Sequence, residues 1–174
     1  MQHIELILGG ARSGKSALAE QRALESGCEL YYLATATADD TEMAARIAAH
    51  QERRDQRWHT VEEAISLAAA LNEYCQPGRC IVVDCLTLWL SNCLHAQCWE
   101  QEREALLSVL PQLQGQVIFV SNETGLGVVP LGELSRRFVD EAGFLHQALG
   151  ETCQRVILTV AGFPLALKPQ GEQL

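Results

Sequence analysis

A glycine-rich stretch near the N-terminus has the residue types needed to bind a phosphate chain. Residues Gly9-Gly10-Ala11-Arg12-Ser13-Gly14-Lys15-Ser16 match G-x-x-x-x-G-K-[ST] and directly follow an apolar run. Glycines let backbone N–H groups converge on phosphate oxygens, and the N-terminus of a following helix adds a favourable dipole. Lys15 can reach the β- and γ-phosphates, and the Ser16 hydroxyl can ligate Mg²⁺. We therefore predict a triphosphate-binding loop at Gly9–Ser16.

A carboxylate that could share the metal ion follows a second apolar run. The run Cys80-Ile81-Val82-Val83 ends in Asp84. Many strands end in Asp for reasons of turn formation, so the run alone favours neither a structural nor a functional role. Beside a triphosphate loop it favours the metal role, because such sites hold Mg²⁺ with a loop hydroxyl and a strand-end carboxylate. The predicted metal ligands are Ser16 and Asp84.

Arginines surround one histidine in the segment Thr41–Arg57, which we predict to be a helix. At helical spacing, one face would carry Arg46, His50, Arg53 or Arg54, and Arg57. Arginine forks match phosphate oxygens, and imidazole is a nucleophile towards phosphorus. The flanking cations disfavour protonation of the imidazole and keep its lone pair available. The pattern indicates a phosphorus nucleophile at His50, with a solvated helix face and a structural histidine as the alternative.

Strands and helices of the right kind alternate along the chain to position these groups. Nearly continuous apolar runs predict buried strands at Ile4–Leu8, Leu30–Ala34, Cys80–Asp84, Gln116–Val120 and Arg155–Val160. Besides Thr41–Arg57, helices are expected at Lys15–Ser26, Val61–Tyr74, Leu86–His95, Glu100–Gln114 and Leu131–Leu149. Thr60 and Glu63 have capping-box spacing, which we take as the start of the third helix. Phe163–Leu167 could add a last strand through a hairpin, and 121–130 is an expected loop. The expected fold is α/β, a mostly parallel central sheet flanked by helices.

Composition narrows the classes of function. The 174 residues, 48% hydrophobic, suit a single domain over 1–174, and the net charge of -9 argues against nucleic acid as a partner. The seven cysteines include no C-x-x-C pair, which argues against zinc and disulfides and favours reduced thiols in the cytoplasm. We expect no signal peptide and no membrane span.

The ordered series of motifs resembles one enzyme family over nearly the whole chain. The phosphate loop is followed by Glu42–Ile47 leading to His50 and Arg53-Arg54, by Trp58–Glu62, by Asp84-Cys85-Leu86-Thr87 and by Asn92. Next come Ser121-Asn122-Glu123, Gly127-Val128-Val129-Pro130 and Arg136-Arg137-Phe138. The series is similar to adenosylcobinamide kinase/adenosylcobinamide-phosphate guanylyltransferase enzymes of cobalamin assembly. Three positions depart from the usual family residues, namely Gln51, Asp84 and His146.

This resemblance implies a RecA-like P-loop NTPase fold and two reactions. A nucleoside triphosphate, ATP or GTP, phosphorylates adenosylcobinamide, and GTP then donates GMP to that phosphate through a guanylylated histidine. By position, His50 is that histidine, and Lys15 serves the triphosphate. The resemblance also implies that the nucleotide is lined by Gly9–Ser16, by Ala34, Thr35 and Ala36, by Gln51, Glu52, Arg53 and Arg54, and by Glu62 and Asp84. It further implies Mg²⁺ as cofactor and a homo-oligomer, often a trimer.

Two other functions fit parts of the sequence. In an ordinary P-loop kinase for another metabolite, His50 would be only a helix residue. A guanine-nucleotide switch would need a base-reading N-K-x-D element, and here Asn122 is followed by Glu123.

Overall fold

Seven strands form one central sheet in the computed structural model, which describes residues 3–37 and 56–168. The strands run in the spatial order β3-β2-β4-β5-β1-β6-β7. Their bounds are β1 His3–Gly9, β2 Glu29–Ala34, β3 Trp58–Glu62, β4 Arg79–Asp84, β5 Gln116–Asn122, β6 Arg155–Val160 and β7 Phe163–Lys168. All neighbours pair in parallel except β6 and β7, which are antiparallel. The carboxyl ends of β1 to β6 therefore meet along one edge of the sheet.

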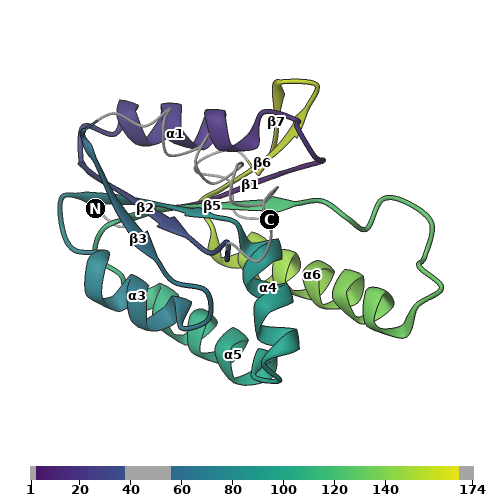
Figure 1. The fold of residues 1–174 in the computed structure, drawn as a ribbon. Coiled ribbons are helices and arrows are strands. Elements are labelled where there is room, and N and C mark those ends of the chain that lie inside the picture. Colours follow the sequence, from purple (N-terminus) through teal and green to yellow (C-terminus); the bar gives the residue numbers. More distant parts are fainter. Residues whose placement is uncertain (1–2, 38–55, 169–174) are drawn as a thin grey trace.

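Helices cover both faces of this sheet (Figure 1). The helix α1 (Lys15–Glu25) lies on one face. The opposite face carries α3 (Leu67–Tyr74), α4 (Leu86–His95), α5 (Trp99–Val109) and α6 (Glu133–Thr152). The α/β prediction, with a mostly parallel sheet between helices and a C-terminal hairpin, is confirmed. No helix of the described ranges is long and apolar enough to cross a bilayer.

The central strands are mostly apolar because both of their faces are buried. In β1, Ile4, Leu6 and Leu8 contact the cluster beneath the four helices, while Ile7 belongs to the cluster beneath α1. The same alternation in β5 sends Phe119 to the larger cluster and Val120 to the smaller one. A strand buried on both sides needs apolar side chains at most positions on both faces, which is why strict alternation is missing from the sequence.

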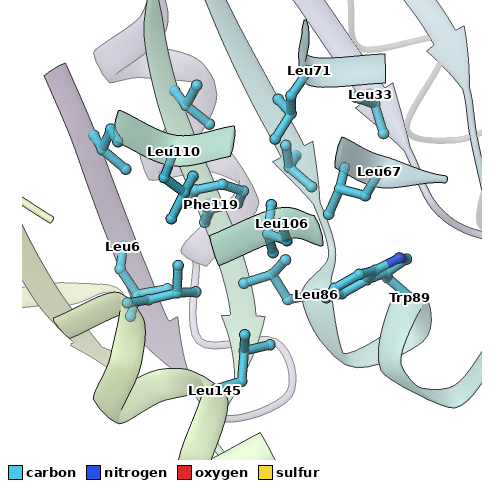
Figure 2. Close-up of a cluster of buried hydrophobic side chains, with 14 of the residues drawn as sticks. Leu6, Leu33, Leu67, Leu71, Leu86, Trp89, Leu106, Leu110, Phe119 and Leu145 are labelled. Atoms are coloured by element: carbon cyan, nitrogen blue, oxygen red, sulfur yellow. The ribbon is translucent and has the colours of Figure 1, made fainter. Parts of the chain in front are cut away.

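The larger core joins the strands to all four helices on its side (Figure 2). Trp89 of α4 and Trp99 of α5 meet edge to face, with ring centroids 5.2 Å apart and planes at 66°. Each indole is buried but keeps its polar atom paired: Trp89 donates to the Ile65 carbonyl at 2.7 Å, and Trp99 to the Glu141 carboxylate at 2.7 Å. These bonds avoid the cost of an unpaired buried N–H group.

One predicted helix is wrong in its first half. Strand β3 covers residues 58–62, which include the first two residues of the predicted helix Val61–Tyr74. The helix α3 begins only at Leu67. The β-branched and aromatic side chains of 58–61 pair with β2, with Tyr31 opposite His59. The capping box of Thr60 and Glu63 is also wrong, because the Glu63 carboxylate instead accepts from the N–H groups of Ile65 and Ser66 at 2.8 and 2.7 Å.

Other boundaries differ by a few residues. Helix α5 ends at Val109 rather than Gln114, and a 3₁₀ turn, η1, covers Leu110–Gln112 because Pro111 cannot donate to the preceding helical turn. Helix α6 runs from Glu133 to Thr152, and β5 extends through Ser121 and Asn122, which the sequence placed in a loop. The predicted helix Thr41–Arg57 lies outside the described residues except for its end, where Arg57 is in a turn that leads into β3.

Candidate functional site

The segment Gly9–Ser16 joins β1 to α1 in the strand, loop and helix context that the motif requires. Gly14 has φ +97° at the N-cap of α1, a backbone conformation that glycine adopts at little cost. At Gly9 a β-carbon would lie 2.6 Å from the Thr159 carbonyl oxygen, so only glycine fits against β6. The loop is thus shaped by close backbone approach, and its N–H groups are available at a helix N-terminus.

Lys15 folds back over the loop that precedes it. Its ammonium group donates to the Gly10 carbonyl oxygen at 2.5 Å, and its side chain is largely buried, with 7% exposed. Burial lowers the pKa of Lys15, and the nearby Asp84 carboxylate opposes that shift. A phosphate oxygen would supply a negatively charged hydrogen-bond partner for this buried ammonium group.

The β6–β7 hairpin supports the loop from the side. Its turn is formed by Ala161 and Gly162, with φ of +51° and +83°. The Gly162 N–H donates to the Ser13 carbonyl oxygen at 2.9 Å, and a β-carbon on Gly14 would lie 3.4 Å from the Gly162 α-carbon. Figure 1 shows the hairpin on the same side of the sheet as α1. The hairpin turn therefore fixes the position of the loop, in addition to connecting β6 to the last strand of the sheet.

Asp84, one of the two predicted metal ligands, lies beside Ser16, the other. The Ser16 hydroxyl donates to Asp84 Oδ2 at 2.6 Å, and the Tyr32 hydroxyl donates to the same oxygen at 2.8 Å. A serine hydroxyl and a carboxylate are oxygen ligands of the kind that Mg²⁺ prefers, and Mg²⁺ usually keeps only one or two protein ligands beside phosphates and water. The donor set thus fits Mg²⁺, and Asp84 and Ser16 are the residues that would hold it.

The ends of three neighbouring strands bring the next predicted residues together. Ala34 of β2 pairs in register with Glu62 of β3 on one side and with Asp84 of β4 on the other. Thr35 is fully buried, and its hydroxyl both donates to the Cys85 carbonyl at 2.7 Å and accepts from the Cys85 N–H at 2.8 Å. The peptide bond between Asp84 and Cys85 is cis. The strand pairing and the Thr35 hydrogen bonds join Ala34 and Thr35 to Asp84 and Cys85, and Glu62 is exposed at their side.

A hollow of about 480 Å³ opens next to this strand edge, lined in part by Thr37, Ile65 and Asn92. The Asn92 amide donates to the carbonyl oxygens of Thr35 at 2.9 Å and Ala64 at 3.1 Å. Asn92 thereby ties α4 to the segments that follow β2 and β3.

Four predicted nucleotide contacts and the predicted nucleophile lie outside the described residues. They are His50, Gln51, Glu52, Arg53 and Arg54. The remaining predicted site residues, Gly9–Ser16, residues 34–36, Glu62 and Asp84, lie along the carboxyl edge of β1 to β4.

Sequence reasoning missed two contributors to this site. Tyr32 hydrogen-bonds Asp84, and Thr87 accepts from the Asn122 amide at 3.0 Å. The sequence analysis named Thr87 only within the motif Asp84-Cys85-Leu86-Thr87, and Tyr32 only within the predicted strand Leu30–Ala34. The available signal was the alternation of β2, which puts Tyr32 on the same face of the sheet as Asp84 once the two strands are neighbours.

Comparison with known proteins identifies the family. The pattern of the family described as cobinamide kinase / cobinamide phosphate guanyltransferase matches residues 5–167. The chain belongs to this family. It is 61% identical over 173 residues to the "bifunctional adenosylcobalamin biosynthesis protein CobP" of Pseudomonas aeruginosa, covering 98% of this chain and 99% of that protein. It is 34% identical to the corresponding protein CobU of Escherichia coli, covering 94% and 98% of the two chains.

The cobinamide kinase / cobinamide phosphate guanyltransferase family has two activities in its description, and this member is a bifunctional enzyme of cobalamin biosynthesis that carries both. Its fold is shared more widely. A KaiC-like protein of Pyrococcus horikoshii superposes with a TM-score of 0.55 at 15% identity, covering 98% of this chain and 81% of that one. The RecA-like P-loop fold predicted from the sequence is thereby confirmed.

Proposed function

We propose that the enzyme first phosphorylates the aminopropanol hydroxyl of adenosylcobinamide with ATP or GTP, and then attaches GMP from GTP to that phosphate through a guanylylated His50. The observation that carries this proposal is the placement of Lys15, Ser16 and Asp84 around one loop, with the Ser16 hydroxyl 2.6 Å from the Asp84 carboxylate. This is the arrangement in which a triphosphate and its metal ion are held together for displacement at phosphorus.

In the kinase step, the loop N–H groups and Lys15 bind the phosphates and stabilise the charge that develops during transfer. Mg²⁺ held by Ser16 and Asp84 would neutralise phosphate charge. The acceptor oxygen forms a bond to the γ-phosphorus, the bond to the β,γ-bridging oxygen breaks, and the hydroxyl proton passes to solvent. Positioning the two reactants is the main contribution of the chain in such a step.

In the transferase step, an imidazole nitrogen of His50 attacks the α-phosphorus of GTP and releases pyrophosphate. A phosphate oxygen of adenosylcobinamide phosphate then attacks the same phosphorus, the P–N bond breaks, and adenosylcobinamide-GDP is released. The covalent intermediate divides one difficult transfer into two easier displacements. Arg53 and Arg54 are proposed to bind phosphate oxygens near His50, with Gln51 and Glu52 as further nucleotide contacts.

The guanosine is proposed to lie along residues 34–36 and Glu62. The buried Thr35 and the Asn92 amide hold this edge in place, and the hollow beside Thr37 offers room for a ring. Glu62 is exposed, and a carboxylate can accept hydrogen bonds from ribose hydroxyls or from the N–H groups of guanine.

Labelling with GTP that carries radioactive phosphorus at the α-position tests the transferase proposal. We expect acid-labile, alkali-stable label on the wild-type protein, and its loss on addition of adenosylcobinamide phosphate. His50→Ala should abolish the label. The matched control is His59→Ala, because the His59 side chain is 58% exposed and lies on β3 away from the loop. Equal labelling of the His50→Ala variant, or no label on the wild type, would reject the intermediate.

We also propose that the enzyme is a homo-oligomer, with a trimer as the expected assembly, that works in the cytoplasm. The support for self-association is β7, the last strand of the sheet, which exposes Phe163, Leu165 and Leu167 along its length. An apolar edge strand favours contact with a second chain. The support for the cytoplasm is that all seven cysteines are free thiols.

A further inference from the structure

Asn122 ends strand β5, between the strand that leads into the phosphate loop and the strand that ends in Asp84. In the order β4-β5-β1, Asn122 pairs with Gly9, and Val120 pairs with Asp84. Neighbouring strands lie about 4.8 Å apart. The Asn122 backbone therefore adjoins the first residue of the loop, two residues beyond the level of Asp84.

The side chain of Asn122 belongs to the face of the sheet on which α1 begins. Ile118 and Val120 of β5 lie in the cluster beneath α1, as does Val82 of β4. Side chains alternate along a strand, so Asn122 shares a face with Val120, just as Asp84 shares one with Val82. Asp84 indeed bonds Ser16 at the start of α1. Asn122 is thus on the side where a nucleotide in the loop would place its phosphates.

Hydrogen bonds from three successive residues, Ser121, Asn122 and Glu123, hold this end of β5 in place. The Glu123 N–H donates to the Gly9 carbonyl at 2.9 Å, and the Asn122 amide donates to Thr87 Oγ1 at 3.0 Å. On the opposite face, the buried Ser121 hydroxyl lies 2.8 Å from Nε2 of His146, whose side chain is only 9% exposed. A group held in this way is positioned before a ligand binds, and little entropy is lost when it makes a further bond.

The Asn122 amide keeps unused hydrogen-bonding capacity. An amide nitrogen has two hydrogens, and within residues 3–37 and 56–168 only the bond to Thr87 occupies one of them. The neighbouring carboxylate of Glu123 is directed elsewhere, since it accepts from the Gly125 N–H at 2.6 Å and lies 3.9 Å from His146 Nδ1. The charge that would repel phosphate therefore lies towards α6, and Asn122, opposite Gly9 in the sheet, offers a neutral amide at the start of the loop.

We propose that Asn122 donates its second amide hydrogen to the terminal phosphate of the bound triphosphate, and that Thr87 is the positioning residue that orients this amide. The contact would distinguish a triphosphate from a diphosphate, because only the former has a phosphate at this point. It would also hold the γ-phosphoryl group for the transfer. This last role rests on the proposed kinase function, whereas the binding contact requires only that a triphosphate occupies the loop.

Calorimetric binding of two nucleotides tests the contact without any turnover. With Mg²⁺ present, the dissociation constants of the β,γ-imido analogue of GTP and of GDP are measured for wild type and Asn122→Ala. We expect affinity for the triphosphate analogue to fall about tenfold or more, as befits a hydrogen bond to a charged oxygen, and affinity for GDP to change less than about threefold. Asn72→Ala, at an exposed asparagine of α3, is the matched control and should change neither value.

A second pair of variants tests the role of Thr87. Thr87→Val keeps the shape but removes the acceptor, and should reduce the preference for triphosphate over diphosphate, while Thr87→Ser should restore it. This pair also decides the question if Asn122→Ala does not fold. Equal losses for both nucleotides, or no loss for either, would overturn the proposal. Absence of cobinamide phosphorylation by the wild type would instead reject the proposed kinase function, and the binding ratios would still report on Asn122.

Discussion

The Asp84 carboxylate is a point where three separate elements meet. One oxygen accepts from Ser16 of α1 and from Tyr32 of β2, while Asp84 itself ends β4. Two donors on one oxygen fix the orientation of the carboxylate. The carboxylate is thus held in place before a cation binds.

Replacing Asp84 by Asn should weaken the response to magnesium selectively. The change keeps the size of the side chain but removes the negative charge, so we expect the Mg²⁺ concentration needed for half-maximal pyrophosphate release to rise about tenfold or more. Tyr32→Phe is the comparison, because it removes only one hydrogen bond, worth about 1 kcal/mol, and should shift the midpoint no more than about fivefold. Coincident Mg²⁺ titrations for wild type and Asp84→Asn would remove Asp84 from the metal site.

The functional residues that sequence could identify are those within a local motif. Lys15, Ser16 and the loop glycines have fixed spacing, and their chemistry follows from that spacing alone. Tyr32 and the Thr35 bridge to Cys85 could not be predicted, because they depend on β2 lying next to β4. Strand order is set by contacts between distant segments, and no spacing in the sequence records it.

At the scale of elements, the apolar runs predicted five strands correctly, whereas the edge strand β3 was missed. The central strands are recognisable because burial on both faces demands an unbroken apolar run. Strand β3 is exposed or half-buried along its length, and His59, Thr60 and Glu62 give it a polar sequence. Pairing with β2 makes this segment a strand. The capping-box spacing of Thr60 and Glu63 indicated the start of a helix instead, but the Glu63 carboxylate accepts from the Ile65 N–H.

Packing around the loop predicts that two adjacent glycines respond differently to replacement by alanine. In Gly9→Ala the β-carbon would lie 2.5 Å from Ser13 Oγ and 2.6 Å from the Thr159 carbonyl, whereas at Gly10 it would meet nothing within 4 Å. We expect Gly9→Ala to lower stability by about 1 to 3 kcal/mol, as overpacking does, and to weaken nucleotide binding. Gly10→Ala should change stability by less than about 1 kcal/mol. Thermal unfolding without nucleotide provides the measurement, and equal midpoints for the two variants would contradict the proposed packing.

At the scale of the whole molecule, charge and apolar surface are unevenly distributed. The chain carries a net charge of -9, yet the loop that is proposed to bind a polyanion offers backbone N–H groups and Lys15. Local donors must therefore overcome the general field, which falls off within about 10 Å at moderate salt. Apolar side chains are exposed on β7 and in the loop before α6, where Leu126, Val128 and Leu131 are 82%, 96% and 97% exposed.

The exposed edge of β7 predicts how the assembly can be broken. Light scattering during gel filtration should give the wild type a mass several times the 19.1 kDa of one chain. Leu165→Lys places a charge on the edge strand and should shift the mass towards that of one chain. Leu24→Lys, at a partly exposed position on α1, is the control and should leave the mass unchanged. A wild type that elutes at 19.1 kDa would rule out self-association through β7.

The position of β1 also determines when the nucleotide site can exist during protein synthesis. The strand and the loop after it leave the ribosome before β5 and β6, yet β1 lies between these two strands, and the loop is braced by the turn at Gly162. A nascent chain that ends at residue 110 has the complete motif and none of these three supports. Because long-range pairing must come before the loop takes its shape, GTP should not protect such a chain from proteolysis, and protection should begin only after the hairpin has emerged.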